Sequence, residues 1–231
     1  MLAYNHLMRI NKYLAHAGIG SRRGVEELIT KGLVSVNGEV ASLGQDVSST
    51  DQVMVNGKLI SKPVELMYYL VNKPRGVVST TSDPEGRRTV LSLIPGLKSR
   101  IYPVGRLDYE SEGLMLLTND GDLSYRLTHP KFEVEKTYLV QVKGKLSAKA
   151  VTLLEKGIKI EGKKTAPAKV VVTEARTDRT WFKITIHEGR NRQIRKMCEA
   201  LDFPVMRLIR IKLGEWELGK LKPGEYEKIL I

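Results

Sequence analysis

The sequence predicts an α+β protein built from a small N-terminal module and a larger second domain on a mostly antiparallel mixed sheet. Three observations lead to this fold class. The N-terminal part contains two short helical patterns followed by strands joined at two Asn-Gly turns. The rest of the chain has many short strand patterns with helices between them in no strict β-α-β order, which favours antiparallel pairing. The 231 residues are enough for two unequal domains with a sizeable core.

Two short helices are predicted at the start of the N-terminal module, which is expected to span residues 8–62. The first begins at Arg9, carries apolar residues at helical spacing and stops at Gly18. Ser21 is expected to cap the second helix, residues 22–31, because a serine side chain accepts a hydrogen bond from a free N–H group of the first turn. Hydrophobic runs around the Asn-Gly turns then predict strands at residues 33–36, 39–41, 53–55 and 58–60.

The second domain is expected over residues 63–231, after a linker at Ser61-Lys62-Pro63 where the proline blocks helix continuation. A loop with two turn signals is predicted at residues 80–88. Capping residues and apolar spacing predict helices at residues 122–128, 148–156 and 191–201. Alternating or continuous apolar runs predict strands at residues 68–72, 114–117, 134–143, 169–173, 181–187 and 205–213, and the tail 224–231 is expected to complete the sheet.

Positive charge is concentrated in the second domain. The chain carries 38 Lys+Arg against 26 Asp+Glu, a net charge of +12, but up to Lys62 there are only seven basic and five acidic residues. A solvated surface would explain an ordinary run of charges. Arg190, Arg192 and Arg195, however, crowd one turn-to-helix junction with few acidic neighbours, so they repel one another unless phosphates or a buried carboxylate compensate. The surplus indicates an anionic partner.

Several classes of chemistry lack the residues that they need. The chain has no GxxxxGK[ST] motif, and its four scattered histidines and one cysteine offer no metal-ligand spacing. Cys198 lies on an apolar helical pattern and is expected in the core rather than as a nucleophile. No apolar run reaches the roughly 18 residues of a membrane span, and no signal-peptide pattern is present, so a cytoplasmic location without a membrane partner is expected. An enzyme with this sequence is expected to use carboxylates, arginines and tyrosines, with no cofactor or metal.

Two groups of motifs now resemble known proteins. Residues 9–18 (RINKYLAHAG), 21–23 (SRR) and 32–38 (GLVSVNG) resemble an S4 RNA-binding domain. Four further segments, in the same order and spacing, resemble the signatures of the bacterial ribosomal RNA pseudouridine synthases that carry an S4 domain. These segments are residues 73–76 (KPRG), 105–114 (GRLDYESEGL), 135–138 (EKTY) and 187–197 (HEGRNRQIRKM). The resemblance covers residues 9 to 230 and is strongest to the B-type large-subunit enzymes, with the small-subunit enzymes as the nearest alternative.

The resemblance implies an isomerase that breaks the bond between N1 and C1′ of a uridine, turns the base and rejoins it through C5. Asp108 matches the catalytic aspartate, acting as a nucleophile or as a base at the 2′ position of the sugar. Arg195 matches the arginine that pairs with this aspartate, and Arg106 is a second candidate for that pairing. Tyr138 matches the tyrosine that packs on the flipped base. Ile194 is expected to line the same pocket or to lie in the core.

The partner that the resemblance implies is structured rRNA, with 23S rRNA favoured, either free or within an assembling ribosomal subunit, and a monomeric enzyme is expected. Three alternatives remain open: the same reaction on 16S rRNA, an enzyme acting on tRNA or another small RNA, and a non-catalytic S4 protein of ribosome assembly. The basic side chains expected to bind RNA are Arg9, Lys12, Arg22, Arg23, Lys73, Arg75, Arg106, Arg190 and Arg192.

Overall fold

The computed structural model describes residues 7–60, 65–97 and 99–231. Internal contacts divide the chain into two compact units, Met1–Leu66 and Met67–Ile231. The predicted linker at Ser61-Lys62-Pro63 lies outside the described residues, and the domain boundary predicted between residues 62 and 63 stays a prediction. Each unit has its own hydrophobic core, so each is described by itself.

The first unit contains the two predicted helices, α1 (Ile10–His16) and α2 (Arg22–Thr30). Ser21 caps α2 as expected, because its Oγ accepts a hydrogen bond of 3.0 Å from the N–H of Gly24. The helices bury Ile10 and Leu14 from α1, and Val25 and Ile29 from α2, against the small sheet beneath them. The helical periodicity of the sequence is thereby confirmed.

Four strands form the sheet of the first unit in the order β3-β2-β5-β6. Both Asn-Gly pairs turn the chain between neighbouring strands, with positive φ at Asn37 (53°) and Asn56 (49°) as such tight turns require. A further two-stranded ladder, β1 (Met8–Arg9) with β4 (Asp46–Val47), was not predicted because its strands are too short for a periodic signal. The four predicted strands are β2 (Val34–Val36), β3 (Glu39–Val40), β5 (Val53–Val55) and β6 (Lys58–Leu59).

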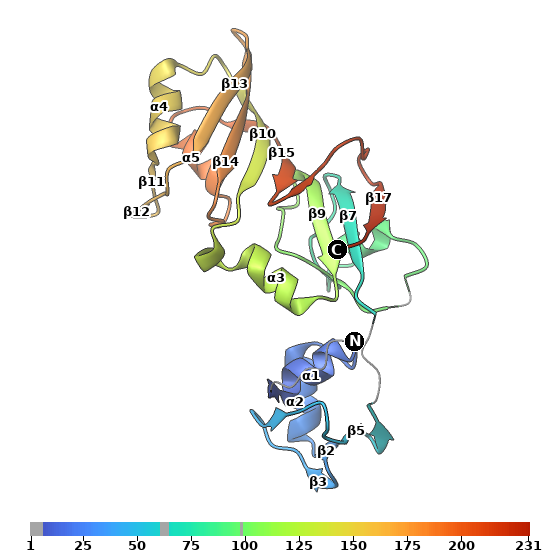
Figure 1. The fold of residues 1–231 in the computed structure, drawn as a ribbon. Helices are drawn as coiled ribbons and strands as arrows, with labels where there is room; N and C mark the ends of the chain where they lie inside the picture. The colour runs from blue at the N-terminus through green and yellow to red at the C-terminus, as the bar shows by residue number, and fades with distance from the viewer. Residues whose placement is uncertain (1–6, 61–64, 98) are drawn as a thin grey trace. The chain divides into compact units, whose positions relative to one another are not determined.

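The second unit is built on a nine-stranded mixed sheet whose main order is β13-β14-β10-β15-β9-β7-β17 (Figure 1). Among the described strand pairs of this sheet, β15 and β9 run parallel and the others run antiparallel, as the sequence predicts. The two remaining strands, β8 and β16, pair with β9 and β15. The bounds are β7 (Tyr68–Lys73), β8 (Tyr102–Pro103), β9 (Glu112–Thr118), β10 (Lys136–Lys143), β13 (Lys169–Ala175), β14 (Arg179–Ile186), β15 (Val205–Leu213), β16 (Trp216–Glu217) and β17 (Tyr226–Ile229).

Helices accompany both halves of this sheet. Figure 1 shows α4 and α5 beside the half that contains β13, β14 and β10, whereas α3 lies nearer to β9. Helix α5 is shorter than predicted because Arg192, just before it, adopts a left-handed conformation with φ +52° that a helix cannot include. The helical elements are α3 (Gly121–Thr128), α4 (Ala148–Lys156), α5 (Gln193–Glu199) and two 3₁₀ turns (Val90–Leu93 and Pro130–Phe132), with a small ladder of β11 (Lys159–Ile160) and β12 (Lys163–Lys164).

Strand β9 is the centre of the second unit, since all seven of its residues are buried. Apolar side chains cover both of its faces: Met115 and Leu117 belong to one hydrophobic cluster, and Leu114 and Leu116 belong to another. Cys198 lies in the first cluster, where burial raises the pKa of its thiol to about 12. This environment agrees with the core position predicted for Cys198, because an unreactive neutral thiol is what burial favours.

Candidate active site

A cavity of about 370 Å³ opens where the two hydrophobic clusters of the second unit meet. Its wall is made by the loop 104–108 before β9, the end of α3, the first part of β10, the segment 189–194 before and in α5, and β15. Asp108, Tyr138 and Ile194 all line it. The structure therefore brings together side chains that are up to 86 positions apart in the sequence, counted from Asp108 to Ile194.

Asp108 stands in the turn that leads into β9. Its backbone carbonyl accepts a hydrogen bond of 2.9 Å from the N–H of Ser111, which fixes the turn, and its side chain is half-buried. Within the described part of the chain the carboxylate has no hydrogen bond or ion pair. Two cations act on it through space, because Asp108 raises the pKa of both Lys73 and Arg195. The carboxylate is thus oriented by its turn, faces the cavity and is left open for a ligand.

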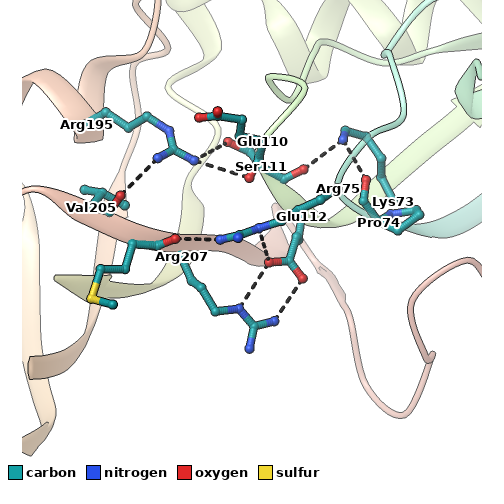
Figure 2. A network of polar contacts seen from close by, with 10 residues as sticks. Lys73, Pro74, Arg75, Glu110, Ser111, Glu112, Arg195, Val205 and Arg207 are labelled. Atoms are coloured by element: carbon teal, nitrogen blue, oxygen red, sulfur yellow. Dashed lines mark hydrogen bonds and ion pairs between the residues drawn. The ribbon is translucent and has the colours of Figure 1, made fainter. Parts of the chain in front are cut away.

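Arg195 lies behind the cavity wall, on α5. Its side chain is buried, and its guanidinium nitrogens donate to the carbonyl oxygens of Val205 (3.4 Å) and Glu110 (3.3 Å) and to Ser111 Oγ (3.4 Å), as Figure 2 shows. Burial lowers the pKa of Arg195, followed by repulsion from Arg192, while Glu110 and Asp108 oppose the shift. The expected ion pair between Arg195 and Asp108 is not formed in this structure. The guanidinium instead holds the turn that carries Asp108.

Tyr138 enters the cavity from β10. It is 8% exposed, and the ladder between β10 and β15 shifts register just before it, between Thr137 and Tyr138. Such an irregularity increases the local twist of a strand and redirects a side chain. Tyr138 lines the same cavity as Asp108.

Lys73 requires a correction, because it was expected to bind RNA and its side chain is completely buried. Its ammonium donates to the carbonyl oxygens of Pro74 (2.9 Å) and Ser111 (2.8 Å), so it links the end of β7 to the turn after Asp108 (Figure 2). Burial lowers its pKa from 10.5 to about 8, and the charges of Asp108 and Glu112 oppose the shift. A lysine in this position cannot reach a phosphate, and its role is internal.

The shifted pKa of Lys73 predicts a pH-dependent stability. The folded protein binds this proton less tightly than the unfolded chain, so the free energy of unfolding rises between about pH 8 and 10.5 as the ammonium is lost. We expect wild type to gain on the order of 2 kcal/mol relative to Lys73→Met across this range. Urea unfolding of both proteins at several pH values measures the difference, and parallel curves would contradict the buried ammonium.

All of the other predicted RNA-binding side chains except Lys12 fall into two groups. In the first, the charge already has a protein partner: Arg9 pairs with Asp46 (3.4 Å), Arg75 with Glu112 (3.0 Å) and Arg190 with Glu188 (3.3 Å). Arg190 also donates to the carbonyl oxygens of Lys163 (3.2 Å) and Lys164 (2.7 Å), so much of its role is structural. Lys12 is half-buried on α1. The second group is exposed to solvent and consists of Arg22, Arg23, Arg106 and Arg192, of which the last two also line the cavity.

Two cationic residues of the cavity were not predicted as site residues. Lys136 precedes Tyr138 by two positions on β10, and Arg210 follows Leu208 by two positions on β15. Because alternate residues of a strand share a face, Lys136 could have been found by extending the alternation from Tyr138. No residue of β15 had been assigned to the pocket from the sequence, so Arg210 had no such signal.

The chain was compared with known proteins. Residues 67–200 match the family model described as RNA pseudouridylate synthase, and residues 8–53 match the S4 domain. The chain belongs to the RNA pseudouridylate synthase family. The ribosomal large subunit pseudouridine synthase B of Bacillus subtilis strain 168 is 44% identical over 224 residues, which cover 96% of this chain and 91% of that protein. The protein of the same name from Yersinia pestis is 40% identical over 225 residues, covering 93% of this chain and 70% of the relative.

A solved structure supports the same membership in the pseudouridylate synthase family. The crystal structure of a pseudouridylate synthase superposes with a TM-score of 0.70 at 31% identity and covers 96% of both chains. The α+β fold with an N-terminal S4 domain, and the assignment as an isomerase, are thereby confirmed. In the described ranges no helix is long and apolar enough to cross a membrane.

Proposed function

We propose that this pseudouridine synthase isomerises a uridine of 23S ribosomal RNA and that Asp108 is its catalytic residue. The observation that carries the proposal is that Asp108, whose carboxylate has no hydrogen bond or ion pair within the described residues, and Tyr138 line one cavity of about 370 Å³. A protein that only binds RNA has no need for a half-buried carboxylate at a cavity. The intact pair therefore supports the enzyme over the non-catalytic alternative.

Asp108 performs the central step in this proposal. The bond between C1′ and N1 breaks while the carboxylate either attacks C1′ or removes the proton at C2′. The released base turns and its C5 forms the new bond to C1′, which breaks the C1′–carboxylate bond or, on the other route, is accompanied by return of the proton to C2′. C5 then loses its proton and N1 gains one. Arg195 and Lys73 hold the turn that carries Asp108 through hydrogen bonds to Glu110 and Ser111.

Tyr138 receives the flipped base. A uridine stacked in folded RNA is out of reach for a half-buried carboxylate, so the nucleotide has to swing out of the RNA into the cavity. The Tyr138 ring offers a flat apolar surface on which the uracil stacks, at the wall next to Asp108. Arg106 and Arg192 are exposed and line the same cavity, which suits them to the phosphates on either side of the target.

Large-subunit RNA is the proposed substrate because the Bacillus and Yersinia relatives are both named as ribosomal large subunit enzymes. The place of action that follows is the cytoplasm, where rRNA is made and assembled. Purified protein incubated with transcribed 23S rRNA, transcribed 16S rRNA and assembling large subunits tests the proposal. Pseudouridine is expected at a defined position of 23S rRNA or of the large-subunit particle, and a product confined to 16S rRNA would contradict it.

The exposed arginines are expected to make the binding of rRNA depend on salt. Each phosphate contact contributes roughly 0.7 to 0.9 to the slope of log K against log salt concentration. Arg22→Gln in the S4 domain and Arg192→Gln at the cavity are each expected to reduce the slope by about that amount. Arg176→Gln is the control, because Arg176 already pairs with Glu174, and an equal slope in all three variants would contradict these contacts.

A further inference from the structure

Two neighbouring positive charges, Arg210 and Lys136, line the cavity, and the proposed reaction has not yet used either of them. Arg210 is 2% exposed, and its Nε donates to the carbonyl oxygen of Leu114 at 2.7 Å. Lys136 is partly buried, and its Nζ donates to the carbonyl oxygen of Val134 at 2.9 Å. Both residues line the cavity with Asp108 and Tyr138, and Arg210 is the cross-strand partner of Tyr138 in the ladder between β10 and β15.

This pair of cations is not compensated by the protein. Neither Lys136 nor Arg210 forms an ion pair within the described residues, and the Arg210 Nη2 atom is shut off from solvent without any hydrogen-bond partner. Burial lowers the pKa of Lys136, and the neighbouring Arg210 lowers it further. A buried charge without a counter-charge is strongly unfavourable, and buried polar groups are ordinarily hydrogen-bonded. The arrangement is what a site for negative charge supplied by a ligand requires.

The burial of Arg210 indicates which part of the RNA it meets. The phosphates of an internal nucleotide belong to a continuous chain that has to enter and leave the site, so they stay at its open side. The base is attached to the chain only at C1′, so it can enter the cavity further than the phosphates can. Burial follows the same order, since Arg106 and Arg192 are exposed at the cavity, whereas Arg210 is buried next to Tyr138.

We infer that Arg210 and Lys136 contact the uracil ring of the flipped nucleotide and stabilise the negative charge that develops on it during the reaction. The inference rests on the proposed function. When the bond between C1′ and N1 breaks, its electron pair stays on the ring, and the resulting anion is shared by N1, O2 and O4. The positive charge left at C1′ is taken up by the Asp108 carboxylate or by loss of the C2′ proton to it. Preorganised donors that face such a forming anion lower the barrier without strengthening substrate binding.

The test separates the rate of the chemical step from binding. Single-turnover rates and the Kd for the 23S rRNA substrate are measured for wild type, Arg210→Met and Lys136→Met. The control is Arg179→Met, because Arg179 lies on β14 and is paired with Asp178. We expect Arg210→Met to slow the chemical step by about 100- to 1,000-fold. Lys136→Met is expected to slow it by about tenfold or more. The Kd of both should stay within about twofold and the salt slope should be unchanged, and the control should match wild type.

Other outcomes would overturn the inference. A Kd that rises, a salt slope that falls by about one contact and a preserved single-turnover rate would make the pair a phosphate site. If both variants fold and keep the single-turnover rate of wild type, Arg210 and Lys136 have only a structural role. Thermal unfolding shows whether Arg210→Met is folded. If it is not, the rate of Lys136→Met decides whether the pair acts in the chemical step, because Lys136 is partly exposed. Arg210→Ala is then also assayed with low millimolar guanidinium, which should restore the rate where the same concentration of sodium chloride does not. Failure of the proposed function is distinct, because wild type would then form no pseudouridine.

Discussion

Replacing Asp108 by asparagine is expected to lower the rate of pseudouridine formation by roughly ten-thousandfold or more, while the Kd for rRNA stays within about twofold. Asparagine has nearly the same size, but its neutral amide can neither attack C1′ as the carboxylate does nor act as a base at C2′. The structure gives a reason for the unchanged affinity: in the described residues no side chain pairs with the Asp108 carboxylate, so the substitution breaks no protein contact.

Glu110→Gln is the matched control for this experiment. Glu110 is an exposed carboxylate two residues along the same turn, and its side chain does not line the cavity. The control should keep both the rate and the affinity of wild type. Loss of RNA binding and of turnover to the same degree in Asp108→Asn would remove the catalytic assignment and make the residue a structural or binding one.

Gly113→Ala is expected to destabilise the second unit by about 3 kcal/mol or more. A Cβ at this position would lie 2.3 Å from the carbonyl oxygen and 2.6 Å from the backbone nitrogen of Arg210, and backbone atoms cannot move aside as a flexible side chain does. Gly113 also has a φ of +106°, which a side chain disfavours. The contact lies at the parallel pairing of β9 and β15, so the substitution separates the strand after Asp108 from the strand that carries Arg210.

Gly224→Ala isolates the contribution of backbone conformation. Its φ is +88°, close to that of Gly113, but a Cβ there would meet nothing within 4 Å. Its expected destabilisation is about 1 to 2 kcal/mol. Denaturant unfolding of both variants measures the difference, and equal losses would show that the close approach of β9 and β15 is not rigid.

Local patterns predicted most elements of the fold because their causes are local. Ser21 caps α2 and the Asn37-Gly38 turn joins its strands through contacts within a few residues. The order of the nine strands could not be predicted in the same way. The parallel pairing of β15 with β9 depends on Gly113 lying against Arg210, 97 positions away. Hydrophobic periodicity within each strand cannot predict such a contact.

The candidate site was predicted only in part, because some of its features are local in the sequence and others depend on contacts between distant residues. The motif around Asp108 and the alternation that contains Tyr138 are visible in the chain, and both residues line one cavity. The burial of Lys73 is not visible, because it follows from a hydrogen bond to the Ser111 carbonyl 38 positions away. A lysine in a basic sequence is ordinarily exposed, so the RNA-contact prediction followed the usual behaviour of the residue and not its place in the fold.

The most direct test of the account is a map of pseudouridines in the rRNA of cells that lack this gene, complemented with either wild type or Asp108→Asn. We expect one 23S rRNA site that disappears on deletion, returns with wild type and stays absent with the variant. An unchanged pseudouridine map after deletion, or a site that Asp108→Asn restores, would contradict it.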